Sequence, residues 1–228
     1  MTRLFLAVGS VGAFATAAIA APSVTIDLTG VQIKNATNQS RDSSTAAPAT
    51  IDAARHYRYE VTGLVKGDSG VLKTLYPNPT PVATVLEAFA PGASAGLSGE
   101  SCNPAGTLPL VLGSDTQSGT TQLGLLSVTY GLTLTVGIRG DGVAYFDLTN
   151  VVLTPAFLVG SMSFTSGEAR LTAFCAADFN GDGFLTFEDF DAFVSSFEGG
   201  SASSDLNCDG FLTFEDFDAF VAEFGQGC

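Results

Sequence analysis

The chain has 228 residues, of which 46% are hydrophobic and 14% are charged, and its formal net charge is −14. Such an excess of acids argues against nucleic-acid binding through a basic face. The single histidine, His56, and the absence of tryptophan argue against sites built from several histidines and against sugar platforms built on tryptophan. The charge also changes abruptly along the chain, because residues 175–228 contain twelve acids and no Lys or Arg, whereas residues 21–174 contain eleven acids and eight bases. This step predicts a domain boundary near residue 174.

Residues 1–20 have the pattern of a secretory signal peptide. Arg3 precedes an apolar segment that runs from Leu4 to Ala18, and residues 18–20 (Ala-Ile-Ala) form a small-x-small cleavage site. The apolar segment is short and rich in alanine for a membrane span, and no second hydrophobic stretch follows it. We therefore expect a secreted or cell-surface protein with no membrane span in its mature chain. In an oxidising environment its cysteines can pair.

Residues 21–174 alternate apolar and polar side chains with the period of a β-strand. Segment 128–138 places its Val, Tyr, Leu and Ile residues on one face and its Thr and Gly residues on the other, and a turn at 139–142 leads into a second strand at 143–148. Further predicted strands are Val24–Leu28, Tyr57–Val65, Val82–Phe89, Leu108–Leu112, Met162–Phe164 and Leu171–Phe174. No segment has a sustained helical period, and residues 34–50 are interpreted as a long surface loop. The predicted fold is a β-sandwich, with a jelly roll as one variant.

No catalytic motif is evident in this predicted sandwich. Its acids are scattered, and nothing in the sequence pairs two of them across a cleft as a glycosidase requires. His56 is interpreted as a surface residue at the start of a strand, the alternative being a general base. The five tyrosines are expected to pack in or around the sandwich, the alternative being a surface that stacks on sugar. We therefore predict that the chain is not an enzyme.

The C-terminal part contains an internal repeat with a 27-residue period. Residues 178–194 (DFNGDGFLTFEDFDAFV) and 205–221 (DLNCDGFLTFEDFDAFV) differ only at their second and fourth positions. The opening pattern Asp-x-Asn-x-Asp-Gly is that of a calcium loop of the EF-hand type, because calcium prefers about six to eight hard oxygen ligands in a flexible shell. Two such loops in register predict two Ca²⁺ ions.

Each loop is expected to supply its ligands from alternating positions. Side chains at positions one, three and five converge on one point, and glycine at position six permits a sharp turn. Position seven offers a backbone carbonyl, position nine acts through water, and position twelve closes the shell. The predicted ligands are Asp178, Asn180, Asp182, Phe184 (backbone), Thr186 (through water) and Asp189 in the first loop, and Asp205, Asn207, Asp209, Phe211 (backbone), Thr213 (through water) and Asp216 in the second.

A helix is predicted after each loop, with apolar residues at 187, 190, 193, 194 and 197 and again at 214, 217, 220, 221 and 224. No incoming helix precedes the first loop, because Ala176 and Ala177 leave no room before Asp178. The C-terminal residues 175–228 are so few that core burial alone makes them only marginally stable, and the carboxylates within each loop repel one another. We therefore expect its folding to be coupled to metal binding.

Two calcium loop–helix repeats, with Asp at position twelve and a short linker at 198–204, resemble the type I dockerin domain. The C-terminal placement and the final Gly227-Cys228 resemble the GC-type dockerin-anchored bacterial proteins in particular. The resemblance covers residues 175–228 and implies a small α-helical, dockerin-like domain that attaches the protein to a cohesin-like or cell-surface partner. The contacts known in the family imply that Phe187, Glu188, Phe214 and Glu215 bind this partner. An alternative interpretation of equal weight is that Phe187 and Phe214 are core residues of the small domain.

The four cysteines permit three complete pairings. In the dockerin family the two ends of the module lie close together, which implies a Cys175–Cys228 disulfide, with Cys102 and Cys208 paired or free. The alternative is a Cys102–Cys175 disulfide within the predicted sandwich.

The sequence thus predicts a signal peptide at 1–20, a β-sandwich of unknown role at 21–174 and a dockerin-like calcium-binding domain at 175–228. The predicted function is attachment of the sandwich to a protein partner. The alternatives are a carbohydrate-binding or structural surface module, and a polysaccharide-active enzyme; both would make a polysaccharide a further partner.

Overall fold

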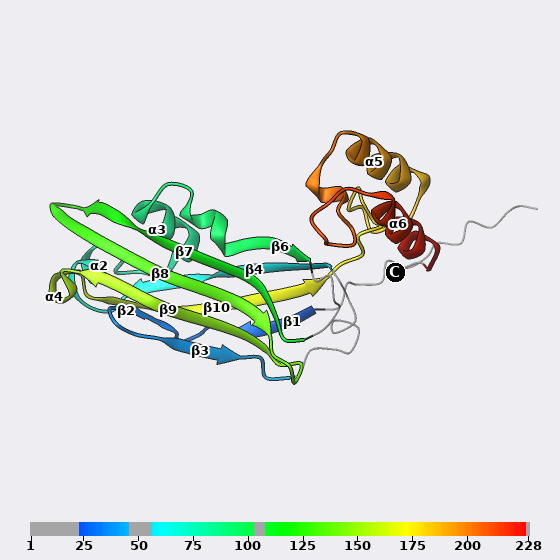
Figure 1. Ribbon diagram of the computed structural model, residues 1–228. Coiled ribbons are helices and arrows are strands. Elements are labelled where there is room, and N and C mark those ends of the chain that lie inside the picture. Colours follow the sequence, from blue (N-terminus) through cyan, green and yellow to red (C-terminus); the bar gives the residue numbers. More distant parts are fainter. Residues whose placement is uncertain (1–22, 46–55, 103–107, 227–228) are drawn as a thin grey trace, which may run out of the picture.

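The computed structural model describes residues 23–45, 56–102 and 108–226, and within them two antiparallel sheets pack face to face (Figure 1). One sheet has the strand order β1-β10-β4-β5, with β2 also paired to β10 and β6 to β4; the other has the order β3-β9-β8-β7. The strands of the first sheet are β1 (Ser23–Asp27), β2 (Gln32–Lys34), β4 (His56–Gly67), β5 (Thr80–Pro81), β6 (Ser98–Cys102) and β10 (Ser161–Ala173). Those of the second are β3 (Gln39–Asp42), β7 (Leu110–Leu123), β8 (Leu126–Ile138) and β9 (Ala144–Thr154).

The alternating side chains of these strands build the core between the sheets. Val128, Val136 and Ile138 of β8 are completely buried, whereas the threonines between them face outward. On the opposing sheet, Ile26 of β1 and Leu171 of β10 are also completely buried. Apolar burial of this kind is the main stabilising term of a sandwich. The predicted β-sandwich is therefore confirmed.

Several details of the strand prediction need correction. β7, β8 and β9 follow one another as neighbours in a single sheet, so the topology gives no support to the jelly-roll variant. The two short strands predicted at 162–164 and 171–174 belong to one long strand, β10, whose register shifts between Phe164 and Ser166. Residues 39–42, predicted as part of a loop, form β3 and pair with β9 as an edge strand.

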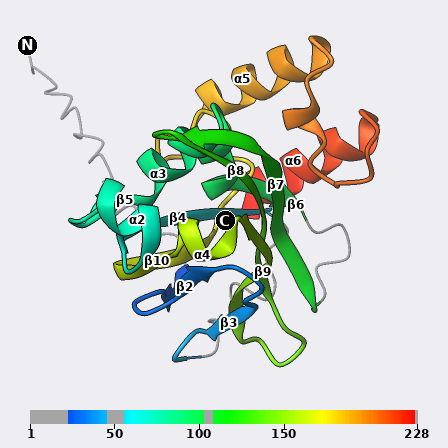
Figure 2. The same ribbon diagram turned by 90° about the vertical axis from the view of Figure 1, so that its left-hand side faces the viewer.

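The prediction that residues 82–89 form a strand, and that the sandwich lacks helices, is wrong. These residues form helix α3 (Val82–Phe89), whose apolar positions 82, 85, 86 and 89 share one helical face. Pro81 precedes the helix as its N-cap residue, where its missing N–H costs no helical hydrogen bond. Shorter helical segments are α2 (Gly70–Leu75), η1 (Ala93–Leu97) and α4 (Ala156–Val159). Figure 2 views the sandwich from the end that carries α2 and α4, opposite the end that carries α5 (Phe187–Glu198) and α6 (Phe214–Gln226).

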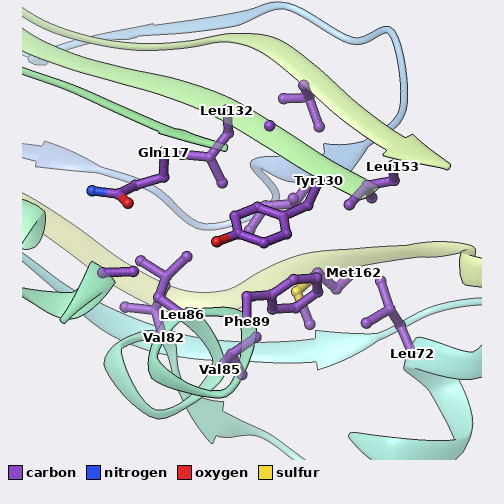
Figure 3. Close-up of a pocket in the computed structure, with 14 residues that line it drawn as sticks. Leu72, Val82, Val85, Leu86, Phe89, Gln117, Tyr130, Leu132, Leu153 and Met162 are labelled. Atoms are coloured by element: carbon purple, nitrogen blue, oxygen red, sulfur yellow. The ribbon is translucent and has the colours of Figure 1, made fainter. Parts of the chain in front are cut away.

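A small apolar cavity of about 30 Å³ lies between α3 and the two sheets (Figure 3). Leu72 of α2, Phe89 of α3, Tyr130 of β8 and Met162 of β10 contribute to its lining. The Phe89 ring meets the Tyr130 ring edge to face, with 5.5 Å between the ring centroids. An apolar cavity of this size stays dry. Helix α3 therefore completes the core along this side of the sandwich.

The cavity provides a test of how α2 contributes to the core. Leu72→Ala would enlarge the cavity and is expected to lower the free energy of unfolding by about 2–5 kcal/mol. Leu75→Ala in the same helix removes a side chain that is 42% exposed and should cost much less. Urea unfolding monitored by tyrosine fluorescence measures the unfolding free energy of both variants, since all five tyrosines lie in residues 57–145. Equal losses for the two variants would contradict this account of the core.

Candidate metal centre

The two repeats fold into matching loops, each followed by a helix. The first loop, residues 178–189, leads into α5, and the second loop, residues 205–216, leads into α6. A short 3₁₀ helix, η2 (Ala202–Ser204), lies between α5 and the second loop. Each helix therefore begins at position ten of its loop, as the apolar spacing predicted.

Side-chain oxygens of the first loop are held in place by backbone N–H groups of the same loop. The two carboxylate oxygens of Asp178 accept hydrogen bonds from the N–H groups of Asp182 (3.0 Å) and Gly183 (2.9 Å). Asn180 Oδ1 also accepts from the Asp182 N–H (2.9 Å), and Asp182 Oδ1 accepts from the Phe184 N–H (2.8 Å). The oxygens at positions one, three and five are thus gathered around one short turn of backbone.

The second loop repeats this geometry almost atom for atom. Asp205 accepts from the N–H groups of Asp209 (3.1 Å) and Gly210 (2.8 Å). Asn207 Oδ1 accepts from Asp209 (2.9 Å), and Asp209 Oδ1 accepts from Phe211 (2.8 Å). Each distance lies within 0.1 Å of its counterpart in the first loop. The shared ligand sequence therefore produces one shared loop conformation.

Left-handed backbone at two positions makes this turn possible. Gly183 and Gly210, at position six, both have φ of 84°, a conformation that costs glycine no steric strain. Position four is also left-handed in both loops, with φ of 74° at Gly181 and 65° at Cys208. Glycine at position six thus has the role that the sequence predicted.

The aspartates at position twelve tie each loop to its helix. Asp189 is completely buried and accepts hydrogen bonds from the backbone N–H groups of Asn180 (3.1 Å) and Thr186 (2.8 Å). Asp216, also completely buried, accepts in the same way from Asn207 (3.1 Å) and Thr213 (2.7 Å). The threonine hydroxyls cap the helices by accepting from the N–H groups of Glu188 and Glu215, both at 3.2 Å. The predicted water-mediated role of Thr186 and Thr213 stays a prediction.

The charge of these loops is not balanced by any side chain of residues 175–228, which contain no Lys, Arg or His. Within the described residues, the ion pairs Arg58–Glu100, Arg139–Asp42 and Arg170–Glu168 all belong to the sandwich. A buried carboxylate without a countercharge is costly. A cluster of carboxylate, amide and backbone oxygens is also the donor set that hard divalent cations prefer. The residues of both loops therefore fit a calcium ion.

Phenylalanine rings build the core between the two helices. Phe193 of α5 and Phe220 of α6 are completely buried and stack, with 4.3 Å between the ring centroids and 10° between the ring planes. Phe179 and Leu206, which occupy position two of the loops, pack against this pair. The helical spacing in the sequence thus identified the residues that hold the two repeats together.

The structure excludes the interpretation of Phe187 and Phe214 as core residues, while their contact with a partner stays a prediction. Their side chains are 79% and 81% exposed, so they are not core residues, and Glu188 and Glu215 beside them are exposed as well. Phe184 and Phe211 are 47% and 70% exposed. The ring contacts run in series from Phe187 through Phe190 and Phe217 to Phe214, with centroid separations of 6.2, 6.0 and 6.3 Å. We call this series of four rings the phenylalanine path.

A disulfide joins the second loop to the sandwich. Cys102, at the end of β6, is bonded to Cys208, with 5.8 Å between the two Cα atoms. This pairing excludes the alternative Cys102–Cys175 disulfide. Cys228 lies outside the described residues, so the Cys175–Cys228 disulfide stays a prediction. A bridge between residues so distant in sequence needs a contact between the two parts of the chain that local patterns do not reveal.

His56 lies beside this disulfide and is 7% exposed, so its interpretation as a surface residue is wrong. Its Nδ1 atom is 3.5 Å from Cys102 Sγ, and its Nε2 atom is 3.1 Å from the Leu206 carbonyl oxygen. The His56, Cys102 and Cys208 ligand atoms lie within 4.8 Å of one another, but the two sulfurs are bonded to each other rather than free to bind a metal. The imidazole therefore bridges the sandwich and the second loop.

The tyrosines do not form the sugar-stacking surface weighed from the sequence. Tyr57, Tyr59 and Tyr130 are buried, and Tyr76 and Tyr145 are half-buried. Burial is the main cause that raises the pKa of the Tyr59, Tyr76 and Tyr145 hydroxyls above the ordinary value. Their packing in or around the sandwich is thus the correct interpretation.

No protein-family model matches the chain, and neither do curated proteins or solved structures. Within the described residues, no helix is both long and apolar enough to span a membrane. The predicted signal peptide at 1–20 lies outside the described residues.

Proposed function

We propose that the chain is an exported protein whose residues 175–228 form a dockerin-like module, which binds two Ca²⁺ ions and attaches the β-sandwich to a cohesin-like or cell-surface protein. The observation that carries this proposal is the matched pair of oxygen-rich loops, each closed by a completely buried aspartate. The position of the module at one end of the sandwich supports a role in attachment, because it leaves the rest of the sandwich accessible (Figure 1).

Calcium would offset an electrostatic repulsion between carboxylates that no side chain of the loops neutralises. In each loop, three carboxylates and one amide oxygen are brought together by backbone hydrogen bonds, and no basic side chain of residues 175–228 offsets their repulsion. A divalent cation would supply the countercharge and fix the loop. The residues that would hold it are those predicted from the spacing, at positions one, three, five, seven, nine and twelve.

Removal of calcium is expected to unfold the C-terminal module and leave the sandwich folded. A chelator should abolish the circular dichroism of α5 and α6 and open residues 175–226 to protease, while tyrosine fluorescence, which reports only the sandwich, should not change. Helical signal and protease resistance that survive the chelator would contradict coupled folding.

Calorimetry on the full chain tests the two sites directly. The wild type is expected to bind two Ca²⁺ ions, and Asp189→Asn to bind one. Asp191→Asn is the matched control, since it removes the same charge from an exposed position of α5 two residues away. A stoichiometry of two for Asp189→Asn, or the absence of binding heat in the wild type, would contradict the proposal.

The phenylalanine path supports the partner part of the proposal. Exposed rings at both of its ends lie beside the exposed acids Glu188 and Glu215, and residues 175–228 carry no basic side chain. Contiguous apolar surface rimmed by charge is typical of protein-binding sites. The complementary partner would present an apolar face flanked by Lys and Arg.

Substitution of the two most exposed rings tests this surface. Phe187→Ala/Phe214→Ala should weaken calcium-dependent binding to a panel of purified cohesin-like modules at least 10-fold, because exposed aromatic anchors dominate such interfaces. Phe157→Ala in α4 is the matched control, since it removes a ring that is 84% exposed at the other end of the sandwich. Equal binding by the double variant and the wild type would exclude the path as the contact surface, and binding to no module would argue against a cohesin-like partner.

The outer face of the four-stranded sheet favours a second candidate, a carbohydrate-binding or structural surface module. Hydroxyl pairs cross from β7 to β8 at Ser114–Thr135 (3.4 Å), Thr116–Thr133 (3.1 Å) and Thr120–Thr129 (3.4 Å). If this face binds polysaccharide, Thr116→Val/Thr120→Val should lower retention of the full chain on insoluble polysaccharides several-fold, whereas Thr25→Val on β1 should not. Release of reducing sugar by the wild type would instead favour a polysaccharide-active enzyme.

A further inference from the structure

We propose that the sandwich holds the second loop in its cation-binding conformation through Cys102, Cys208 and His56, so that two loops with the same ligand set differ in calcium affinity. The inference rests on the proposed function, since it assumes that both loops bind calcium. It assigns to Cys208 and His56 a positioning role at the second site and makes that site sensitive to reduction of the disulfide.

The two repeats differ in sequence only at positions two and four, and in the second loop both positions contact the sandwich. Position two is Leu206, whose carbonyl oxygen is 3.1 Å from His56 Nε2, and position four is Cys208, which is bonded to Cys102. In the first loop, by contrast, the side chains of residues 178–189 make their hydrogen bonds to other residues of the same loop. Attachment to the sandwich is therefore what distinguishes the second loop from the first.

The backbone at position four indicates that the disulfide has a conformational role. Cys208 has φ of 65°, in the left-handed region that side chains other than glycine rarely adopt, whereas the first loop has glycine at this position. Without the bridge, an ordinary side chain would favour other loop conformations. The disulfide holds Cys208 in the conformation that the loop geometry needs.

The disulfide at Cys208 and the His56 contact at Leu206 are the two tethers of the second loop, and both act at positions between its ligands. Positions two and four alternate with positions one, three and five, so fixing Leu206 and Cys208 also restricts Asp205, Asn207 and Asp209. A loop that is already ordered loses less conformational entropy when it binds an ion, which raises its affinity. The tether is compatible with the ligand arrangement, because the hydrogen bonds of the second loop match those of the first within 0.1 Å. The second loop should therefore be the tighter site.

Reduction would remove this advantage. A dithiol reductant transfers two electrons and two protons to the Cys102–Cys208 bond, which breaks to give two thiols while the reductant forms its own disulfide. Because reduction also frees two thiols beside His56 as ligands for soft metals, a variant that lacks both thiols is the cleaner test.

The test is calcium titration of the full chain and of Cys102→Ser/Cys208→Gly, which removes the disulfide and gives the second loop the residue found at position four of the first. The wild type should show two affinities that differ at least 10-fold. Asp216→Asn should abolish the tight site and Asp189→Asn the weak one. In the Cys102→Ser/Cys208→Gly variant the tight site should weaken at least 10-fold, while the affinity of the first loop, which the disulfide reaches only indirectly through the helical core, should fall much less and provides an internal comparison.

A second variant distinguishes loss of the contact with the sandwich from general misfolding of the double variant. His56→Ala keeps the disulfide but removes the contact with the Leu206 carbonyl, and it should weaken the tight site several-fold with tyrosine fluorescence unchanged. Two equal affinities in the wild type, or a tight site that neither variant weakens, would overturn this inference and leave the proposed function standing. Absence of calcium binding at both loops would overturn both.

Discussion

Two completely buried carboxylates, Asp189 and Asp216, lie in a part of the chain that has no basic side chain. Each accepts two backbone N–H bonds, one from the loop and one from the residue that caps the following helix. The same carboxylate therefore closes the loop and starts the helix. Any cation that neutralises it would stabilise both elements at once, which links ion binding to the formation of α5 and α6.

The helical core alone is too small to make this region independent of such support. Its buried residues are only Phe193 and Phe220, which stack on each other, Leu206 and two alanines, and partly exposed side chains, mostly phenylalanines, pack around them. The Cys102–Cys208 bridge adds a second source of stability, because it closes a loop of 106 residues. In the chain-entropy account a loop of that length contributes about 4–5 kcal/mol. Residues 175–226 are thus stabilised by the bridge to the sandwich, and a cation bound by the loop carboxylates would add to that stability.

Much of this architecture was predictable from local sequence patterns. The period-two alternation identified β4, β8 and β9, and the repeat located both loops and the helices that begin at Phe187 and Phe214. Helix α3 was missed because a run of only eight residues with two valines is compatible with both a strand and a helix, and its docking against the core decides between them. The buried state of His56 and the partner of Cys208 were also beyond the sequence, since both depend on a contact between residues about 100 or more apart.

The attachment of the second loop has a consequence for the whole C-terminal unit. The first loop is held to the second by the Phe193–Phe220 stack and by serine hydroxyls that join α5 to η2, with Ser196 3.0 Å from Ser203 and 2.9 Å from Ser204. The disulfide at Cys208 therefore also restrains α5, through contacts that run across the unit. Since the phenylalanine path spans both helices, the disulfide that joins the second loop to the sandwich also restrains the position of the path relative to the sandwich. A protein bound to that path would meet the sandwich in a defined orientation, and loss of the Cys102–Cys208 bond would relax that orientation and the second loop together.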